Sequence, residues 1–190
     1  MKTHLTTLAK SLALAFAAIA VFTLSGGVAR ADEVTLTGST VGFSNVPQLT
    51  FTGTSLFSGT TALGIGSLSG SNNLGTLFLS TDPTQLVAGA FSLGVTFTSP
   101  LYISGGQSAS YLAIIEGSVS PNIDQGGVNL HFGPTQIFSF TDGNNISGSF
   151  SFTVADLFVQ SGQAANLTAG FTGQQQTTIP EPATLLLLGT

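Results

Sequence analysis

Hydrophobic and polar residues alternate along most of the chain from Val34 to Thr172, which is the pattern of β-strands with one buried and one exposed face. In the segment GAFSLGVTFTS every second side chain is apolar, and small or polar residues lie between them. The apolar positions of this segment are Phe91, Leu93, Val95 and Phe97. Because successive side chains of a strand point to opposite faces, the segment predicts a strand that covers a core with one face.

Three later segments repeat this alternation. The segment TQIFSFTDGNNISGSFSFTV predicts a hairpin, because Asp-Gly and Asn-Asn favour the positive φ angles of tight turns. Its two strands place four phenylalanines on one face, at Phe138, Phe140, Phe150 and Phe152. The segments GGVNLHFG and NLTAGFTG add the inward positions Val128, Leu130, Phe132, Leu167, Ala169 and Phe171.

Strand segments recur about every ten to fifteen residues, and Gly, Asn, Ser-Pro and Asp-Pro separate them. No helical segment of three turns interrupts this succession. The predicted fold class is therefore all-β: an antiparallel, jelly-roll-like β-sandwich of about eight to ten strands. The stretch from Ser55 to Gly75 fits either a loose edge strand or a long loop.

Charge is scarce and unevenly placed. Charged residues make up 6% of the chain, against about 25% in ordinary soluble domains. The basic residues are Lys2, Lys10 and Arg30, and all eight acidic residues follow them. A chain that is purely acidic after Arg30 repels phosphate backbones, which excludes nucleic acid as a partner. The absence of cysteine excludes disulfides and thiolate metal sites.

The first part of the chain, residues 1–31, has the pattern of a secretory signal peptide. A basic start precedes the apolar run Leu12–Leu24, which would span about 20 Å as a helix and is short for the ~30 Å core of a bilayer. The small residues Ala29 and Ala31 occupy the positions that signal peptidase requires. We therefore expect cleavage before Asp32 and a mature chain outside the cytoplasm.

Candidate catalytic residues are few. His131 is the one histidine after residue 31, and it falls on the polar face of a predicted strand. A Ser-His-Asp triad would combine it with a serine and with Asp124 or Asp142, but no GxSxG segment supports a nucleophile. We therefore expect His131 to be a solvent-facing strand residue and the protein not to be an enzyme.

The acidic residues of the middle region also indicate structural roles. A pair of them would suit a glycosidase, but their positions beside Pro and Gly favour turns in which Asp accepts backbone hydrogen bonds. No DxDxDG spacing is present to indicate a calcium site. We therefore predict that no cofactor is bound and keep calcium as the alternative. These acidic residues are Asp82, Glu116, Asp124, Asp142 and Asp156.

Aromatic and sequon patterns add little to this picture. Trp is absent, and Tyr102 and Tyr111 are the only tyrosines, so few side chains are available to stack on sugars. The glycosylation sequons at Asn145 and Asn166 are expected by chance in a chain rich in Ser, Thr and Asn.

The chain closes with TTIPEPATLLLLGT, in which Pro180, Glu181 and Pro182 precede a run of leucines. The two prolines keep this segment extended and outside any helix or sheet. The ending resembles the PEP-CTERM sorting signal of exported bacterial proteins, in which Pro-Glu-Pro leads into a transmembrane helix and an Arg-rich cluster. The resemblance implies that exosortase, an integral-membrane cysteine protease-transpeptidase of Gram-negative and related bacteria, reads this segment.

The ending departs from the family pattern in one respect. The eight residues after Pro182 would reach about 12 Å as a helix, and no Arg cluster follows them. We therefore expect the sequence to be a fragment that stops inside the helix. The alternative is a truncated gene whose product is freely secreted.

The predicted organisation is a signal peptide at 1–31, a β-sandwich at 32–172, a polar spacer at 173–179 and the sorting segment at 180–190. The resemblance implies a membrane-anchored precursor that is transferred to the cell surface or to an extracellular polysaccharide matrix. There it would have a structural or biofilm role. The alternative is a secreted β-sandwich that binds a glycan or calcium.

Overall fold

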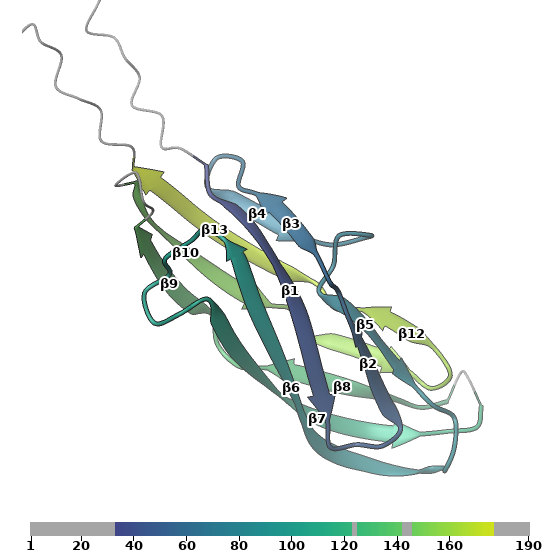
Figure 1. Cartoon of the computed structure of the whole chain (residues 1–190). Helices are drawn as coiled ribbons and strands as arrows, with labels where there is room; N and C mark the ends of the chain where they lie inside the picture. The colour runs from purple at the N-terminus through teal and green to yellow at the C-terminus, as the bar shows by residue number, and fades with distance from the viewer. Residues whose placement is uncertain (1–32, 123–124, 142–145, 177–190) are drawn as a thin grey trace, which may run out of the picture. The chain divides into compact units, whose positions relative to one another are not determined.

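The structure is a computed structural model that describes residues 33–122, 125–141 and 146–176 (Figure 1). These residues form thirteen β-strands, every sheet in them is antiparallel, and they contain no helix. The all-β antiparallel sandwich expected from the alternation is thereby confirmed. Within the same ranges there is no helical segment with the length and hydrophobicity needed to cross a bilayer.

The largest sheet has six strands, and its centre is formed by the long strands β6 and β7, which pair over twelve residues of each. In sheet order its strands are β11 (Leu157–Gln160), β8 (Gly127–Phe132), β7 (Ser108–Val119), β6 (Gln85–Ser99), β1 (Thr35–Ser44) and β3 (Phe57–Thr60).

Two smaller sheets contain the remaining strands. The four-stranded sheet consists of β4 (Ile65–Leu68), β13 (Ala169–Gln176), β10 (Ser147–Val154) and β9 (Gln136–Thr141). The three-stranded sheet consists of β12 (Ala164–Asn166), β5 (Gly75–Leu79) and β2 (Leu49–Gly53).

The core lies between the six-stranded sheet and the two smaller ones, and aromatic rings make the main contacts. Phe97 of β6 meets Phe150 and Phe152 of β10 edge-on, with ring centroids 5.2 and 5.4 Å apart. Phe91, also on β6, meets Phe51 of β2 in the same way at 5.2 Å. The inward positions of β6 therefore join all three sheets, as the alternation in its sequence predicts.

Three features differ from the sequence-based prediction. Strand β13 continues to Gln176, so Gly173–Gln176 belongs to the sheet and not to the predicted spacer. The ambiguous stretch 55–75 contains the two short strands β3 and β4 and the start of β5. Strands of three to five residues of this kind account for the count of thirteen, because they are too short to show a clear alternation.

The two ends of the described sandwich lie together (Figure 1). Glu33, just before β1, and Gln175, near the end of β13, line one hollow, and a methyl of Val34 lies beside Gly173. We call this region the terminal end. The turn 61–64 between β3 and β4 lies here, because the Thr61 N–H donates to the Val34 carbonyl at 2.9 Å. The loop 100–107 begins here as well, since Pro100 and Leu101 line the same hollow as Glu33.

Candidate functional site

The clearest cluster of titratable side chains is a pair, His131 and Asp156, on the outer face of the six-stranded sheet. His131 lies on β8, and Asp156 directly precedes β11, the neighbouring strand. The Asp156 Oδ2 lies 3.0 Å from the His131 Nδ1, and its Oδ1 accepts the Phe132 N–H at 2.8 Å. Both side chains are 58% exposed, as predicted for a solvent-facing histidine. The antiparallel pairing of β8 with β11 thus brings together residues 25 positions apart.

Two hydrogen bonds lower the pKa of the Asp156 carboxyl. The bond from His131 is the larger cause, and that from the Phe132 N–H the second, of a lowered pKa at Asp156. An ionised carboxylate only accepts hydrogen bonds, so Nδ1 carries the proton in this contact. Because the folded-state pKa is depressed, any stabilisation by the pair is present above the usual pKa of Asp and is lost as the pH falls through the folded value.

The pair has two of the three parts of a hydrolytic triad. His131 Nε2 has no hydrogen-bond partner in the part of the chain that the structure describes, so no serine is placed there as a nucleophile. The partner of His131 is Asp156, whereas the predicted triad used Asp124 or Asp142, and both of these lie outside the described residues. The arrangement can hold and orient an imidazole, but it does not by itself place a reacting atom.

We expect the pKa of the Asp156 carboxyl to rise toward the usual value of about 3.9 in His131→Ala, because the larger of its two hydrogen bonds is removed. The rise should be incomplete, since the Phe132 N–H still donates to Oδ1. Carboxyl ¹³C chemical shifts followed through a pH titration measure this value. Asn129→Ala, two residues earlier on the same exposed face of β8, is the control and should leave the Asp156 pKa unchanged. An unchanged value in His131→Ala contradicts the contact.

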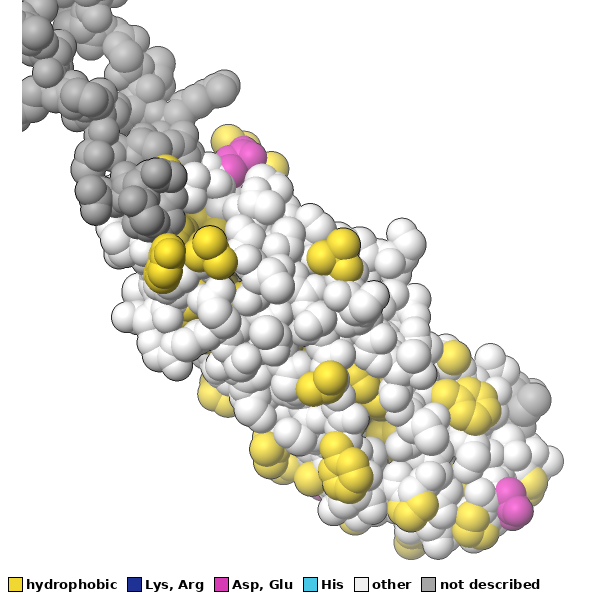
Figure 2. Space-filling view, viewed as in Figure 1, with side chains coloured by type: hydrophobic (Ala, Val, Ile, Leu, Met, Phe, Trp, Pro, Cys, Tyr) yellow, Lys and Arg dark blue, Asp and Glu magenta, His cyan; other side chains and the backbone are white. Residues whose placement is uncertain are grey.

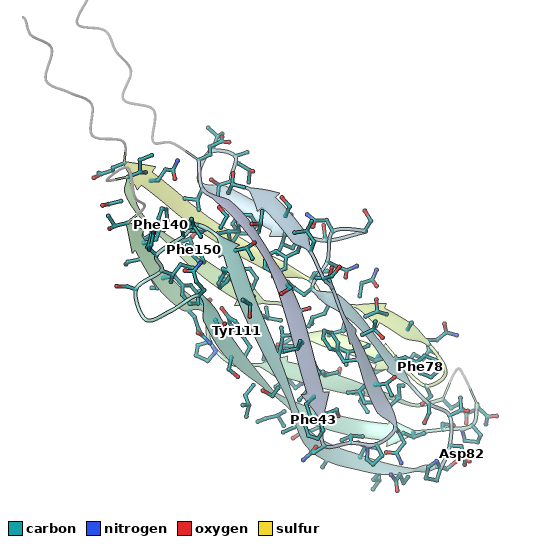
Figure 3. The ribbon with its side chains drawn as sticks, viewed as in Figure 1. Phe43, Phe78, Asp82, Tyr111, Phe140 and Phe150 are labelled. Atoms are coloured by element: carbon teal, nitrogen blue, oxygen red, sulfur yellow. The ribbon has the colours of Figure 1, made fainter. Side chains whose placement is uncertain are left out.

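The other described acidic residues are isolated from one another. Asp82 lies in the turn before β6 (Figure 3), and Glu116 lies on the exposed face of β7 opposite Asn129. Within residues 33–122, 125–141 and 146–176 no three His, Asp or Glu side chains come close enough to hold a metal ion.

Shallow hollows on the surface are lined almost entirely by uncharged residues. Hollows of about 580, 330 and 260 Å³ open between β1 and β2, on β10 and β13, and at the terminal end. Glu33 is the one titratable side chain that lines any of these three. Figure 2 shows the same character on one whole face, where hydrophobic side chains form separate spots on an otherwise largely uncharged surface. These hollows offer hydroxyl and amide groups to a ligand, and Glu33 adds one carboxylate at the terminal end.

The two tyrosines have opposite environments. Tyr111 lies in the core, where its hydroxyl donates to the Phe152 carbonyl at 3.4 Å and burial raises its pKa (Figure 3). Tyr102 is exposed in the loop 100–107. Asn166, the described sequon residue, lies on β12 and accepts a hydrogen bond from the Thr76 hydroxyl, whereas Asn145 lies outside the described residues.

Sequence reasoning missed a group of exposed hydrophobic side chains at the terminal end, namely Leu63, Leu101 and Tyr102. Leu63 and Tyr102 have φ angles of 55° and 57°, and they are the non-glycine residues with positive φ in the described ranges. Such a backbone is an outlier for bulky side chains and costs about 1–3 kcal/mol. No signal in the linear sequence identifies the group, because its members lie in separate turns that the fold brings to one end.

The residues of the two predicted processing signals lie outside the described ranges. These are the cleavage-site residues Ala29, Ala31 and Asp32 and the sorting motif Pro180, Glu181 and Pro182. The described residues next to them, Glu33 and Gln176, both belong to the terminal end. Comparison of the chain with protein-family models, with curated proteins and with solved structures finds no match.

Proposed function

We propose that this chain is an exported, non-enzymatic protein of the cell surface or extracellular matrix, sorted through its C-terminal segment by exosortase. The observation that carries the proposal is the Pro180-Glu181-Pro182 motif followed by leucines, in a chain that begins with a signal-peptide pattern. The β-sandwich is the cargo. Signal peptidase processes its N-terminal side, exosortase its C-terminal side, and the precursor is membrane-anchored in between.

The position of the chain ends supports this proposal. Glu33 and Gln175 line the same hollow, so the segments with the two processing signals continue from one end of the sandwich. The folded body that the Pro-Glu-Pro segment follows in the sequence has no disulfides to form before export is complete.

The surface chemistry supports a neutral polysaccharide as the matrix partner. Serine and threonine hydroxyls form hydrogen-bonded cross-strand pairs on the outer faces of the sheets, and no Lys or Arg occurs after Arg30. Such a surface repels anionic polymers but can exchange hydrogen bonds with hydroxylated ones. Four of these pairs are Thr35–Thr60, Thr37–Thr98, Thr96–Ser108 and Ser151–Thr172.

The test is expression of the complete gene in its own bacterium and in a strain without exosortase, with intact-mass analysis of the exported protein. We expect an N-terminus at Asp32 in both strains, and C-terminal trimming near Glu181 only where exosortase is present. Glu181→Ala should reduce trimming at least about tenfold, since a contact that positions the reacting bond is lost. Thr178→Ala, just outside the motif, is the matched control and should be trimmed normally. Identical C-termini in the two strains would refute sorting by exosortase.

A further inference from the structure

The hydrophobic side chains of the terminal end stand at the tips of turns. Leu63 is 98% exposed, Tyr102 66% and Leu101 55%. In the turn 61–64 and the loop 100–107, positive φ angles occur at a leucine and a tyrosine as well as at the glycines 64, 105 and 106. A strained residue that directs a large apolar side chain into solvent is stable only where the surrounding hydrogen bonds hold it.

Those hydrogen bonds attach the tips to the strands at which the described chain begins and ends. The turn 61–64 is held by the Thr61 N–H donating to Val34, and its Gly64 carbonyl accepts the Gly173 N–H at 3.0 Å. Across the end, the Ser99 hydroxyl donates to the Thr35 carbonyl at 3.2 Å, which places the start of the loop 100–107 beside β1. The three hydrophobic side chains therefore share one end with Glu33 and Gln176.

The opposite end of the sandwich has different turns. The connection 80–84 has the sequence STDPT, and the described part of the next one, 120–122, reads SPN. Asp82 marks this end in Figure 3, far from Phe140, which lines the hollow at the terminal end. The connections 80–84 and 120–122 are thus polar, whereas the turn 61–64 and the loop 100–107 carry exposed Leu and Tyr. Exposed hydrophobic side chains toward the opposite end, such as Leu86, lie on strands and not in these connections.

We propose that the terminal end docks on a lipid bilayer, with Leu63, Leu101 and Tyr102 entering the interfacial region. Leucine gains free energy when it leaves water, and tyrosine prefers the interface, where its ring is in an apolar layer and its hydroxyl stays hydrated. The end has no Lys or Arg and one described acid, Glu33, so the attraction is hydrophobic and does not depend on anionic lipids.

The flanking sequence favours a bilayer over a second copy of the chain. The apolar run Leu185–Leu188, on the far side of the predicted cleavage site, lies in the segment that follows this end in the sequence. Separate turn tips also make a poor protein interface, since a stable one covers about 800 Å² on each partner. The inference rests on the proposed function in one respect only, namely that export brings this end to a membrane.

The absence of tryptophan allows a position-specific test in the full chain. Single reporters are introduced as Leu63→Trp and Tyr102→Trp, and Leu86→Trp serves as the matched control. Leu86 is 89% exposed, and it lies near the start of β6, four residues after Asp82 and away from the terminal end. Each variant is mixed with phosphatidylcholine vesicles, with and without brominated phosphatidylcholine, and Trp emission is recorded.

We expect a blue shift and quenching by the brominated lipid at positions 63 and 102, and neither effect at position 86. Equal responses at all three positions, or none at 63 and 102, would overturn the proposal. A blue shift that appears without vesicles and grows with protein concentration would overturn it in favour of self-association. The assay contains no exosortase, so failure of docking and failure of sorting are separate results.

A second measurement uses loss of binding. The double variant Leu63→Ser with Tyr102→Ser should weaken partitioning of the full chain onto the same vesicles by about a hundredfold, because burial of each of the two large side chains contributes about a factor of ten. Leu86→Ser with Phe158→Ser removes two exposed hydrophobic side chains elsewhere and should leave partitioning unchanged. Equal losses in the two double variants contradict docking through the terminal end.

Discussion

Phe97→Ala is expected to destabilise the folded protein by about 4 kcal/mol, because it removes a whole aromatic ring from the core. The Phe97 ring is 1% exposed, and it meets Phe57, Phe138, Phe150 and Phe152 with centroids 5.2–6.2 Å away. These partners come from strands of two different sheets, so the surrounding structure cannot collapse onto the cavity without moving one sheet against the other. Edge-to-face ring contacts are lost in addition to the buried area.

Urea unfolding followed by far-ultraviolet circular dichroism measures this loss. Phe43→Ala is the matched control, because Phe43 lies on β1 of the same sheet but is 72% exposed. Its removal should change the free energy of unfolding by no more than about 0.5 kcal/mol. If the two variants lose similar stability, the packing of the six-stranded sheet on β10 is not what holds the sandwich together.

Gly38→Ala is expected to destabilise the folded protein by about 3 kcal/mol. Gly38 lies in β1 directly after the irregularity in its pairing with β6. A Cβ at this position would collide with the backbone carbonyl oxygen of Thr96 and would lie 2.6 Å from Cζ of Phe57. The carbonyl belongs to the sheet and cannot move aside, so β1 itself would have to shift and disturb the terminal end where it begins.

Gly170→Ala tests whether this cost comes from the collision or from glycine in a strand as such. Gly170 lies in β13, and no heavy atom would lie within 4 Å of the added Cβ. Its replacement should be neutral or slightly stabilising, because alanine restricts the unfolded chain more than glycine does. Midpoints of thermal unfolding for the two variants decide the question. Equal destabilisation by both would show that the contact between β1 and Thr96 is not as close as described.

Sequence patterns predicted the strands wherever one face is buried. Phe91, Leu93, Val95 and Phe97 all point inward on β6, because alternation is a local property of an extended chain and burial selects one of its two faces. The hairpin of β9 and β10 also has its phenylalanines on one face, as predicted, and Phe138 lies opposite Phe150. The same reasoning placed His131 on the exposed face of β8.

The sequence patterns were less informative where pairing is decided by the backbone. Gly173–Gln176 has no apolar alternation, yet it continues β13, because its peptide groups lie opposite Ser147–Phe150 in the ladder with β10. The short strands β3 and β4 are likewise held by partners distant in sequence, β1 and β13. Backbone hydrogen bonds are the same for every residue type, so composition does not reveal where a ladder stops.

The sequence by itself determined the strand faces, the all-β class and the signal-peptide and Pro-Glu-Pro patterns, because each of these is a property of neighbouring residues. Only the tertiary structure decided which distant residues meet. It made Asp156 the partner of His131 through the pairing of β8 with β11, and it brought Leu63, Leu101 and Tyr102 to one end. These associations depend on the order of strands in a sheet, which long-range packing selects and which no local pattern encodes.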